Sequence, residues 1–400
     1  MSDLAGKVWI SELNSRPGVR PEFDRSRTIR FYDTTLRDGE QTVGVIFSPQ
    51  QKLEIAKKLD QLGVGRIEAG FPKVSAEDGE AISLILRAGL KYAEVWGFAR
   101  ATRGDVEELV RLGLPASVIE TPISDIKLKA YGISREEAVR RATEAIRFAT
   151  QSGIRVAFFG VDGTRADLDF LRHIYSAAID AGAKEIVLVD TIGVCTPEAA
   201  EFLVRWAKEW IGNDIPIHWH GHNDFGLGTA IAIAAVRGGA SWIQGTINGM
   251  GERAGNADIA EVALTLQCLY DVPVEMKLEH IREVSELVRR AGKYELEGWK
   301  PLIGENLFLR ESGAVASQFH IPEAIEPYAA ELVGAKRGIV LGKKSGLDSV
   351  RLKAEQLSIA VPESQRAPVL ERVKRNAIAN GGLISDDEFR AIVQIVTGKS

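Results

Sequence analysis

Short apolar runs recur along this chain about every 30 residues, and each is followed by a stretch with a helical pattern. Eight runs occur, and they are Thr28–Asp33, Val64–Ala69, Ala93–Phe98, Ala116–Glu120, Ile154–Phe159, Glu185–Asp190, Ile215–His220 and Ser241–Thr246. Strands this apolar, separated by helices, indicate a parallel sheet that is covered on its outer side. Eight strand–helix units therefore predict an α/β fold, the (β/α)8 TIM barrel.

A doubly wound open sheet is the alternative arrangement of such units. That fold normally carries a dinucleotide-binding glycine fingerprint after its first strand, and the stretch after Asp33 has none. The glycine-rich run Asn248–Asn256 follows the eighth strand instead and has the wrong spacing for that fingerprint. Its position matches the place where barrels carry binding loops.

Composition divides the chain around the barrel. Residues 1–27 are polar and contain a Pro-Gly pair, so we expect an N-terminal arm. The barrel is predicted over residues 28–292. Residues 293–345 are rich in glycine and proline and are expected to form a linker or first subdomain, and residues 346–400 a second, mainly helical subdomain.

Length and composition exclude several classes of protein. The 400 residues are 45% hydrophobic and 26% charged, which is ordinary for a soluble globular protein. A net charge of -5 without a basic run disfavours nucleic acid or an anionic membrane surface as a partner. No signal sequence and no long apolar stretch is present, so we expect a cytoplasmic protein. The only cysteines, Cys195 and Cys268, exclude a disulfide framework and a thiolate metal cluster.

Histidines cluster at the end of the seventh run, in His218-Trp219-His220-Gly221-His222. Side chains alternate along a strand, so His220 and His222 project to the same side. A single histidine in an apolar strand is more often a packed or hydrogen-bonded core residue than a ligand, and we expect this of His218. A pair beside a glycine-rich turn favours a metal site instead. The carboxylate expected to complete it is Asp38, in the loop after the first strand.

Other polar residues follow the ends of strands, where TIM barrels place their catalytic groups. They are Arg37 and Asp38 after the first strand, Glu68 at the end of the second, Asp190 and Thr191 at the sixth and Asn256 after the eighth. We therefore expect them to converge at one mouth. The plainer alternatives are a local ion pair between Arg37 and Asp38, and a Glu68 that pairs with a lysine or arginine at the mouth.

The expected ligands suit a divalent metal cation. One carboxylate, two neutral imidazoles and an amide oxygen fit Mg, Mn, Zn or Co. Three or four protein ligands leave coordination positions open, as a catalytic site requires. A 2-oxo acid can fill two such positions through its keto oxygen and its carboxylate, while Arg37 and the metal polarise the carbonyl.

Three stretches resemble the isopropylmalate and homocitrate synthase family, whose members are HMG-CoA lyase-like, metal-dependent TIM barrels. Leu36-Arg37-Asp38-Gly39-Glu40-Gln41, with Lys52 after a ten-residue gap, is similar to the first family signature. Ile217–Ala230 resembles the second, and Asn248–Ala257 a third conserved loop. The resemblance extends over about residues 28–350 and includes the late stretch Leu341–Gly346.

The resemblance implies an acyltransferase that condenses an acyl-CoA, usually acetyl-CoA, with a 2-oxo acid and then hydrolyses the thioester. It also implies a homodimer. The residues that carry over are Asp38, His220 and His222 as metal ligands with Asn256 a weaker one, Arg37 as the electrophilic arginine, and Thr191 at the substrate carboxylate. We also expect Arg37 and Gln41 to bind the substrate and Glu68, with Arg37, to act in catalysis. Related lyases have a cysteine in the loop after the eighth strand. Gly249–Asn256 has none, which favours the condensing branch.

The chain departs from the family after the barrel. The family's usual Ser-Gly-Ile-His, whose histidine helps to deprotonate the acyl-CoA, reads Ser312-Gly313-Ala314-Val315 here, and a family tyrosine is replaced by Ile325. Valine cannot move a proton. Either another base acts, such as His320 or a metal-linked water, or the second substrate is unusual. A carbon–carbon lyase on the same metal platform is therefore the alternative, and a non-catalytic relative that binds a metabolite or a protein is a third.

The end of the fourth strand bears on the oxo acid. Lysine-pathway homocitrate synthases have an arginine near this position, which holds the distal carboxylate of 2-oxoglutarate. Val118–Pro122 contains no arginine. This difference disfavours 2-oxoglutarate as the substrate.

Overall fold

The computed structural model describes residues 4–398, and the contacts within it separate two compact units. One is Glu12–Glu295. The other joins the residues up to Ser11 to those from Leu296 onward. The predicted arm is thus divided between the two units. Among the described residues, no helix has both the length and the apolar character that crossing a membrane requires.

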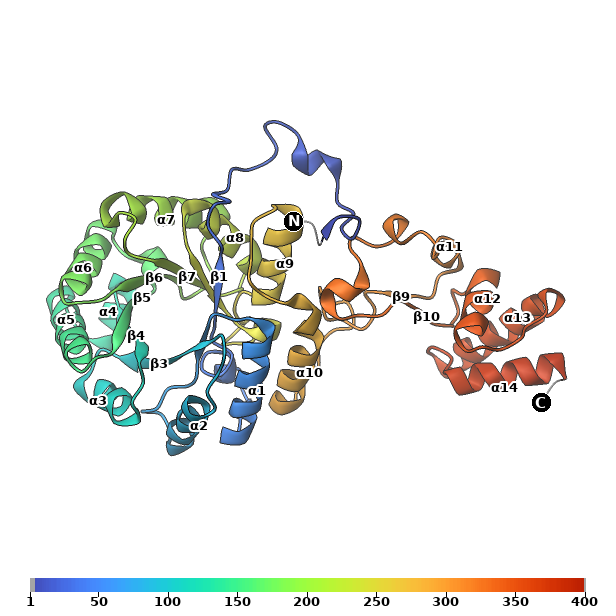
Figure 1. Cartoon of the computed structure of the whole chain (residues 1–400), viewed down its shortest axis with the longest axis horizontal. Coiled ribbons are helices and arrows are strands. Elements are labelled where there is room, and N and C mark those ends of the chain that lie inside the picture. Colours follow the sequence, from blue (N-terminus) through green and yellow to red (C-terminus); the bar gives the residue numbers. More distant parts are fainter. Residues whose placement is uncertain (1–3, 399–400) are drawn as a thin grey trace. The chain divides into compact units, whose positions relative to one another are not determined.

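Eight parallel strands close into a barrel in the Glu12–Glu295 unit (Figure 1). They are β1 (Arg30–Asp33), β2 (Arg66–Glu68), β3 (Glu94–Arg100), β4 (Ala116–Pro122), β5 (Arg155–Val161), β6 (Glu185–Asp190), β7 (Ile217–Gly221) and β8 (Trp242–Gly245). Each strand pairs with the next, and β8 pairs with β1, where Asp33 lies opposite Gly245. The predicted (β/α)8 barrel is confirmed, and the open-sheet alternative is wrong.

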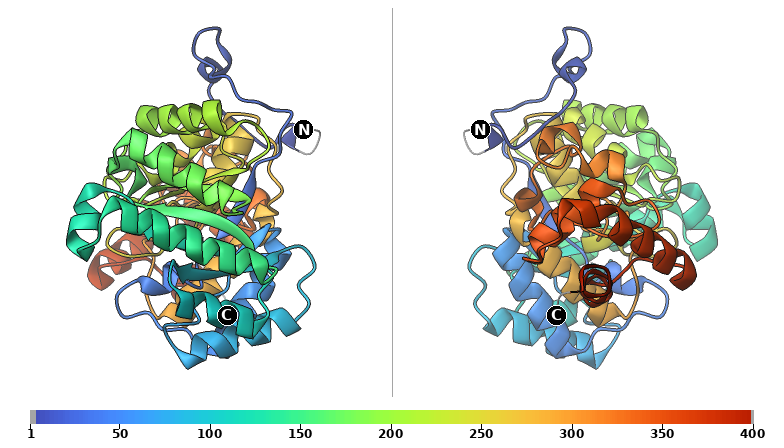
Figure 2. Two further views of the ribbon diagram at one scale, coloured as in Figure 1. Left: turned by 90° about the vertical axis from the view of Figure 1, so that its left-hand side faces the viewer. Right: turned by 90° about the vertical axis from the view of Figure 1, so that its right-hand side faces the viewer.

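The helices of this unit lie outside the strands (Figures 1 and 2). They are α1 (Pro49–Leu62), α2 (Ala76–Arg87), α3 (Arg103–Leu112), α4 (Asp125–Tyr131), α5 (Arg135–Gln151), α6 (Leu168–Asp180), α7 (Pro197–Ile211), α8 (Gly228–Gly238), α9 (Ile259–Leu269) and α10 (Ile281–Gly292). Short 3-10 turns interrupt the connections, and η3 (Gly39–Gln41) and η5 (Ile247–Gly249) lie at the barrel mouth.

Helix α1 illustrates how the sequence sets these elements. Ser48 caps its first turn by accepting a hydrogen bond from the Gln51 backbone, and Pro49 occupies the first helical position. Gly63 ends the helix with φ of 86°, a left-handed conformation that glycine adopts at low cost. The face that packs inward includes Ile55 and Leu59, both fully buried.

A charged cluster fills the barrel below the mouth. This inner cluster consists of Arg66, Glu185, His218 and Gln244. Arg66 Nη1 and Nη2 donate to Glu185 over 2.5 and 2.9 Å, and His218 Nε2 lies 2.6 Å from Glu185 Oε2. Gln244 Nε2 lies 3.2 Å from the other ring nitrogen, Nδ1 of His218. His218 is therefore a hydrogen-bonded core residue, as predicted.

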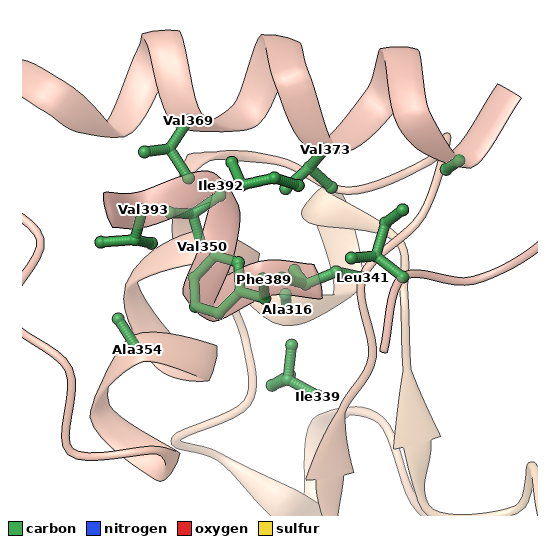
Figure 3. Close-up of a cluster of buried hydrophobic side chains, with 12 residues drawn as sticks. Ala316, Ile339, Leu341, Val350, Ala354, Val369, Val373, Phe389, Ile392 and Val393 are labelled. Carbon is green, nitrogen blue, oxygen red and sulfur yellow. The ribbon is translucent and has the colours of Figure 1, made fainter. Parts of the chain in front are cut away.

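The second unit is mainly helical and has a core of its own (Figure 3). It contains a two-stranded parallel ladder of β9 (Leu309–Arg310) and β10 (Gly338–Ile339), the short helix α11 (Gly313–Ala316), and the helices α12 (Leu347–Gln356), α13 (Glu363–Asn380) and α14 (Asp386–Thr397). Val350, Val373 and Phe389 of the three long helices meet in its centre. Ser385 and Glu388 cap α14 reciprocally.

Candidate metal and active site

Asp38, His220 and His222 lie together where β1 and β7 end. One potential ligand atom from each lies within 4.8 Å of the others. Nε2 of His220 is 3.3 Å from Asp38 Oδ2, and Nε2 of His222 is 3.9 Å from the same oxygen. All three residues are at most 5% exposed. The alternation of β7 brings the two imidazoles to the interior, and the loop after β1 brings the carboxylate to meet them.

Asn256 borders this group from the loop after β8. It forms an isolated bridge with His222 and is 1% exposed. Its amide nitrogen donates to the Met250 carbonyl over 2.9 Å. Gly251, with φ of 147°, passes so close that a Cβ there would collide with the Asn256 amide and lie 3.3 Å from Asp38 Oδ1. We call Asp38, His220, His222 and Asn256 the mouth cluster.

Every member of the mouth cluster has a buried polar atom without a hydrogen-bond partner among the described residues. These atoms are Asp38 Oδ1, His220 Nδ1, His222 Nδ1 and Asn256 Oδ1. Each such atom costs about 1–3 kcal/mol unless something satisfies it. Carboxylate, imidazole and amide groups together are a donor set for a divalent cation. The residues present therefore fit a metal ion.

Charge at the site also suits a cation. Burial alone would raise the pKa of Asp38, but Arg37 and the two neighbouring imidazoles outweigh it and hold that pKa far below its usual range. Burial lowers the pKa of His222 to about 4, although Asp38 opposes the shift. At neutral pH the pair is thus a carboxylate and a neutral imidazole, the protonation states that metal binding requires.

Arg37 is fixed above this group by two carboxylates. Its Nε lies 2.5 Å from Glu68 Oε2 and its Nη1 lies 3.1 Å from Asp38 Oδ2. Its guanidinium carbon is 4.1 Å from the centre of the Phe98 ring. Glu68 also accepts a 3.0 Å hydrogen bond from the Tyr32 hydroxyl. Both plainer alternatives are therefore present: Arg37 pairs with Asp38, and Glu68 pairs with an arginine. They occur together with the convergent metal ligands and do not replace them.

Three further residues were predicted from the sequence, namely Gln41, Thr191 and His320. Gln41 is exposed and, with Arg37, lines a cavity of about 580 Å³. Thr191 is half-buried, and its hydroxyl accepts a 2.8 Å hydrogen bond from the Asp162 backbone. His320 belongs to the C-terminal unit and is exposed. Gln41 is joined to the mouth cluster through its backbone, because its N–H donates a 3.0 Å hydrogen bond to the Asp38 carbonyl.

Two further residues at the mouth were given no role from the sequence. Phe159 of β5 has its ring 5.1 Å from that of His220. Glu120 of β4 lies opposite Phe159 in the strand register, and burial raises its pKa to about 7. Alternation along β4 was the available signal, because Glu120 follows the inward-facing Val118 by two residues.

A family model described as HMGL-like matches residues 28–288, which is most of the barrel unit. The chain belongs to the HMGL-like family. Within that family it is similar to (R)-citramalate synthase CimA of Methanocaldococcus jannaschii, with 39% identity over 93% of this chain and 75% of the relative. It is 40% identical to 2-isopropylmalate synthase of the same organism, over 93% of this chain and 72% of that protein.

Another relative matches the chain almost end to end. Homocitrate synthase AksA of Methanothermobacter thermautotrophicus is 37% identical over 92% of this chain and 94% of that protein. The HMGL-like fold is also found in a solved structure of HMG-CoA lyase from Bacillus subtilis, with a TM-score of 0.60, 18% identity and coverage of 69% of this chain and 96% of the lyase. At that identity the likeness to the lyase shows the fold alone.

Proposed function

We propose that this protein condenses acetyl-CoA with a 2-oxo acid in a metal-dependent reaction and releases coenzyme A by hydrolysis of the thioester. The observation that carries the proposal is the buried group of Asp38, His220 and His222 beneath Arg37, in a chain whose relatives at 37–40% identity are synthases of this kind. The product is a 2-hydroxy dicarboxylic or tricarboxylic acid, depending on the oxo acid.

The mouth cluster would hold the cation, which we expect to be Mg, Mn, Zn or Co. When bound, such a cation acts as a Lewis acid toward the substrate carbonyl. Arg37 supports the same polarisation, because its Nη2 is buried and has no partner among the described residues. That nitrogen can donate to the oxygen on which negative charge develops. Glu68 contacts Arg37 and Tyr32, so we assign it to holding the guanidinium in place rather than to the chemistry itself.

A base must take a proton from the acetyl methyl group. We propose His320 for this role, since it lies five residues after Val315 and its side chain is exposed. We further propose that the protein acts as a cytoplasmic homodimer in which the partner subunit supplies this histidine. Gln41 and Thr191 stay our proposed substrate contacts at the mouth.

A carbon–carbon lyase is the less supported alternative. Val315 at the position of the family's base favours it. Against it, the loop Gly249–Asn256 has no cysteine, and the relatives of high identity are named as synthases.

Thiol release from acetyl-CoA tests the proposal. The purified protein is incubated with each of the four metals and a panel of oxo acids that includes pyruvate, 3-methyl-2-oxobutanoate and 2-oxoglutarate, and products are identified by mass spectrometry. We expect metal-dependent thiol release with at least one oxo acid and none after chelation. Cleavage of a 2-hydroxyacyl-CoA without any condensation would replace the proposal with the lyase.

A further inference from the structure

A buried lysine near the mouth, Lys52, has no role in the proposed metal site or in the proposed action of Arg37. Lys52 of α1 is 1% exposed, although lysine is almost never fully buried unless it is paired. Its ammonium group has three donors and meets three acceptors. They are the Leu36 carbonyl at 3.0 Å, Glu40 Oε2 at 2.5 Å and Asp78 Oδ1. Every donor is therefore used within the protein.

Each of these acceptors anchors a segment that borders the site. The Leu36 carbonyl belongs to the residue directly before Arg37. Glu40 follows Asp38 by two residues, and its second oxygen accepts a 2.7 Å hydrogen bond from the Phe47 backbone. Lys52 thus bonds to residues on either side of Arg37 and Asp38 in the sequence, Leu36 before them and Glu40 after them.

The third acceptor belongs to the segment after β2. Asp78 lies in the first turn of α2, and its second oxygen accepts a 3.1 Å hydrogen bond from the Phe71 backbone. Gly70 lies between Phe71 and the end of β2 with φ of 149°, and a Cβ there would lie 3.2 Å from Asp78 Oδ1 and 3.4 Å from Lys52 Nζ. The backbone after Glu68 therefore packs closely against the side chains of Lys52 and Asp78.

We infer that Lys52 is a positioning residue, which ties the loop after β1 to the loop after β2 and so sets the geometry of Arg37 and Asp38. On the site side, the ion pair of Arg37 and Glu68 joins the loop after β1 to the end of strand β2. Within residues 4–398, the hydrogen bonds and ion pairs of the Lys52 side chain are with Leu36, Glu40 and Asp78 and not with the mouth cluster, so we assign it an effect through these neighbours. The expected effect of Lys52 on turnover rests on the proposed function. Its expected effect on the geometry of the metal ligands does not depend on which reaction the protein catalyses.

The test compares Lys52→Met with Lys58→Met as a matched control. Lys58 lies on the same helix, is partly exposed and pairs with Glu283, which is itself exposed. Mn2+ affinity is measured by titration, and the visible spectrum of the Co2+ form reports ligand geometry. We expect Lys52→Met to weaken Mn2+ binding at least about 10-fold and to alter the Co2+ spectrum, with Lys58→Met matching the wild type.

Turnover at saturating metal is the second measurement. We expect kcat of Lys52→Met to fall about 100-fold, because a shift of about 1 Å in an orienting group has that size of effect. Wild-type Mn2+ affinity together with a wild-type Co2+ spectrum would overturn the inference. If no oxo acid is turned over by the wild type, the proposed function fails, but the two metal measurements still decide the role of Lys52.

A second variant allows for misfolding of the first. Lys52→Met leaves two carboxylates without their cation, so Lys52→Met combined with Asp78→Asn removes the more buried of the two charges. The double variant is expected to regain thermal stability and to keep the weakened Mn2+ affinity. Recovery of wild-type affinity, or loss of the fold in both variants, would make the lysine a structural element of the barrel and overturn its positioning role.

Discussion

Strand β7 contributes to two buried polar clusters, and their polar atoms differ in how many hydrogen-bond partners they have. In the inner cluster, both ring nitrogens of His218 have partners, and Arg66 donates to Glu185 through two nitrogens. In the mouth cluster, His220 and His222 each keep one ring nitrogen without a partner among the described residues. His218 and His220 lie in β7, His222 follows directly after its end, and all three are at most 5% exposed. Burial is thus the same, while hydrogen-bond satisfaction differs.

The difference separates a structural charge cluster from a binding site. A protein gains nothing from a buried donor or acceptor that meets no partner, so a fold without a ligand would be expected to satisfy such atoms internally. The inner cluster nearly does so, with Gln244 Oε1 its unpartnered atom. The mouth cluster has one such atom on each of four residues. Unpartnered polar atoms on four adjoining residues therefore distinguish the mouth cluster from the inner cluster, which has the same burial and also contains a histidine.

Loss of a proposed metal ligand from the mouth cluster should have the largest effect. His222→Ala is expected to abolish metal binding and to lower turnover by about three orders of magnitude or more, because a ligand and its electrostatic contribution are lost. His218→Ala is the paired variant and should still bind Mn2+. Metal content and thiol release are measured for both. Activity that survives both the His222→Ala change and chelation would contradict the assignment.

Removing a charge from the inner cluster should affect folding instead. Glu185→Gln removes the anion that Arg66 and His218 share in the barrel interior, while Arg66 keeps its pair with the partly exposed Glu94. We expect it to lower the free energy of unfolding by about 3 kcal/mol. Urea denaturation measures the loss, and titration with Mn2+ should give wild-type affinity. A large change in metal affinity with unchanged stability would reverse the roles of the two clusters.

Added metal should stabilise the protein through the mouth cluster alone. A cation at 100 times its Kd that binds the folded state stabilises it by about 2.7 kcal/mol. We expect wild type and Glu185→Gln to gain this increment, and Asp38→Asn to lose most of it. Thermal melts with and without Mn2+ provide the measurement. Equal gains in all three proteins would place the bound cation elsewhere.

The smallest effect concerns pH. Burial alone would raise the pKa of Glu185, but His218 and Arg66 outweigh it and lower that pKa to about 2 from an ordinary 4.5. A carboxyl with a depressed folded pKa stabilises the protein above its unfolded pKa, and the contribution is lost as pH falls toward the folded value. The stability advantage of wild type over Glu185→Gln should therefore shrink by about 2 kcal/mol between pH 6 and pH 3. Urea denaturation of both proteins at several pH values measures this change. A stability advantage that stays constant with pH would contradict the pairing of Glu185 with His218 and Arg66.

Much of this organisation follows from patterns within short stretches of sequence. The eight strands lie where apolar runs alternate with helices, and Asp38 meets His220 because strand ends converge at one mouth. Alternation in β7 was enough to predict that the two imidazoles of the mouth cluster share a face. Such local rules predict only the direction of the backbone and the face of each strand or helix on which a side chain lies.

Pairings between distant elements were beyond that reach. Arg66 and Glu185 are separated by 119 residues, and no period in the sequence links Lys52 to Asp78 on another helix. The exposed side chain of Gln41, at the end of a 3-10 turn, lines a cavity with Arg37, and its predicted substrate contact stays a prediction. These details depend on how side chains from separate units interlock, which is decided by three-dimensional packing.

The pairing of β1 with β8 has a consequence for biogenesis. Asp38 emerges early in synthesis, the two imidazoles come roughly 180 residues later, and the loop with Asn256 comes last. A growing chain on the ribosome thus holds an isolated carboxylate while roughly 180 of its 400 residues are added, unable to chelate a cation by itself. For the cation site that we propose, the ligands come together only when the first and last strands pair, so metal binding would accompany closure of the barrel.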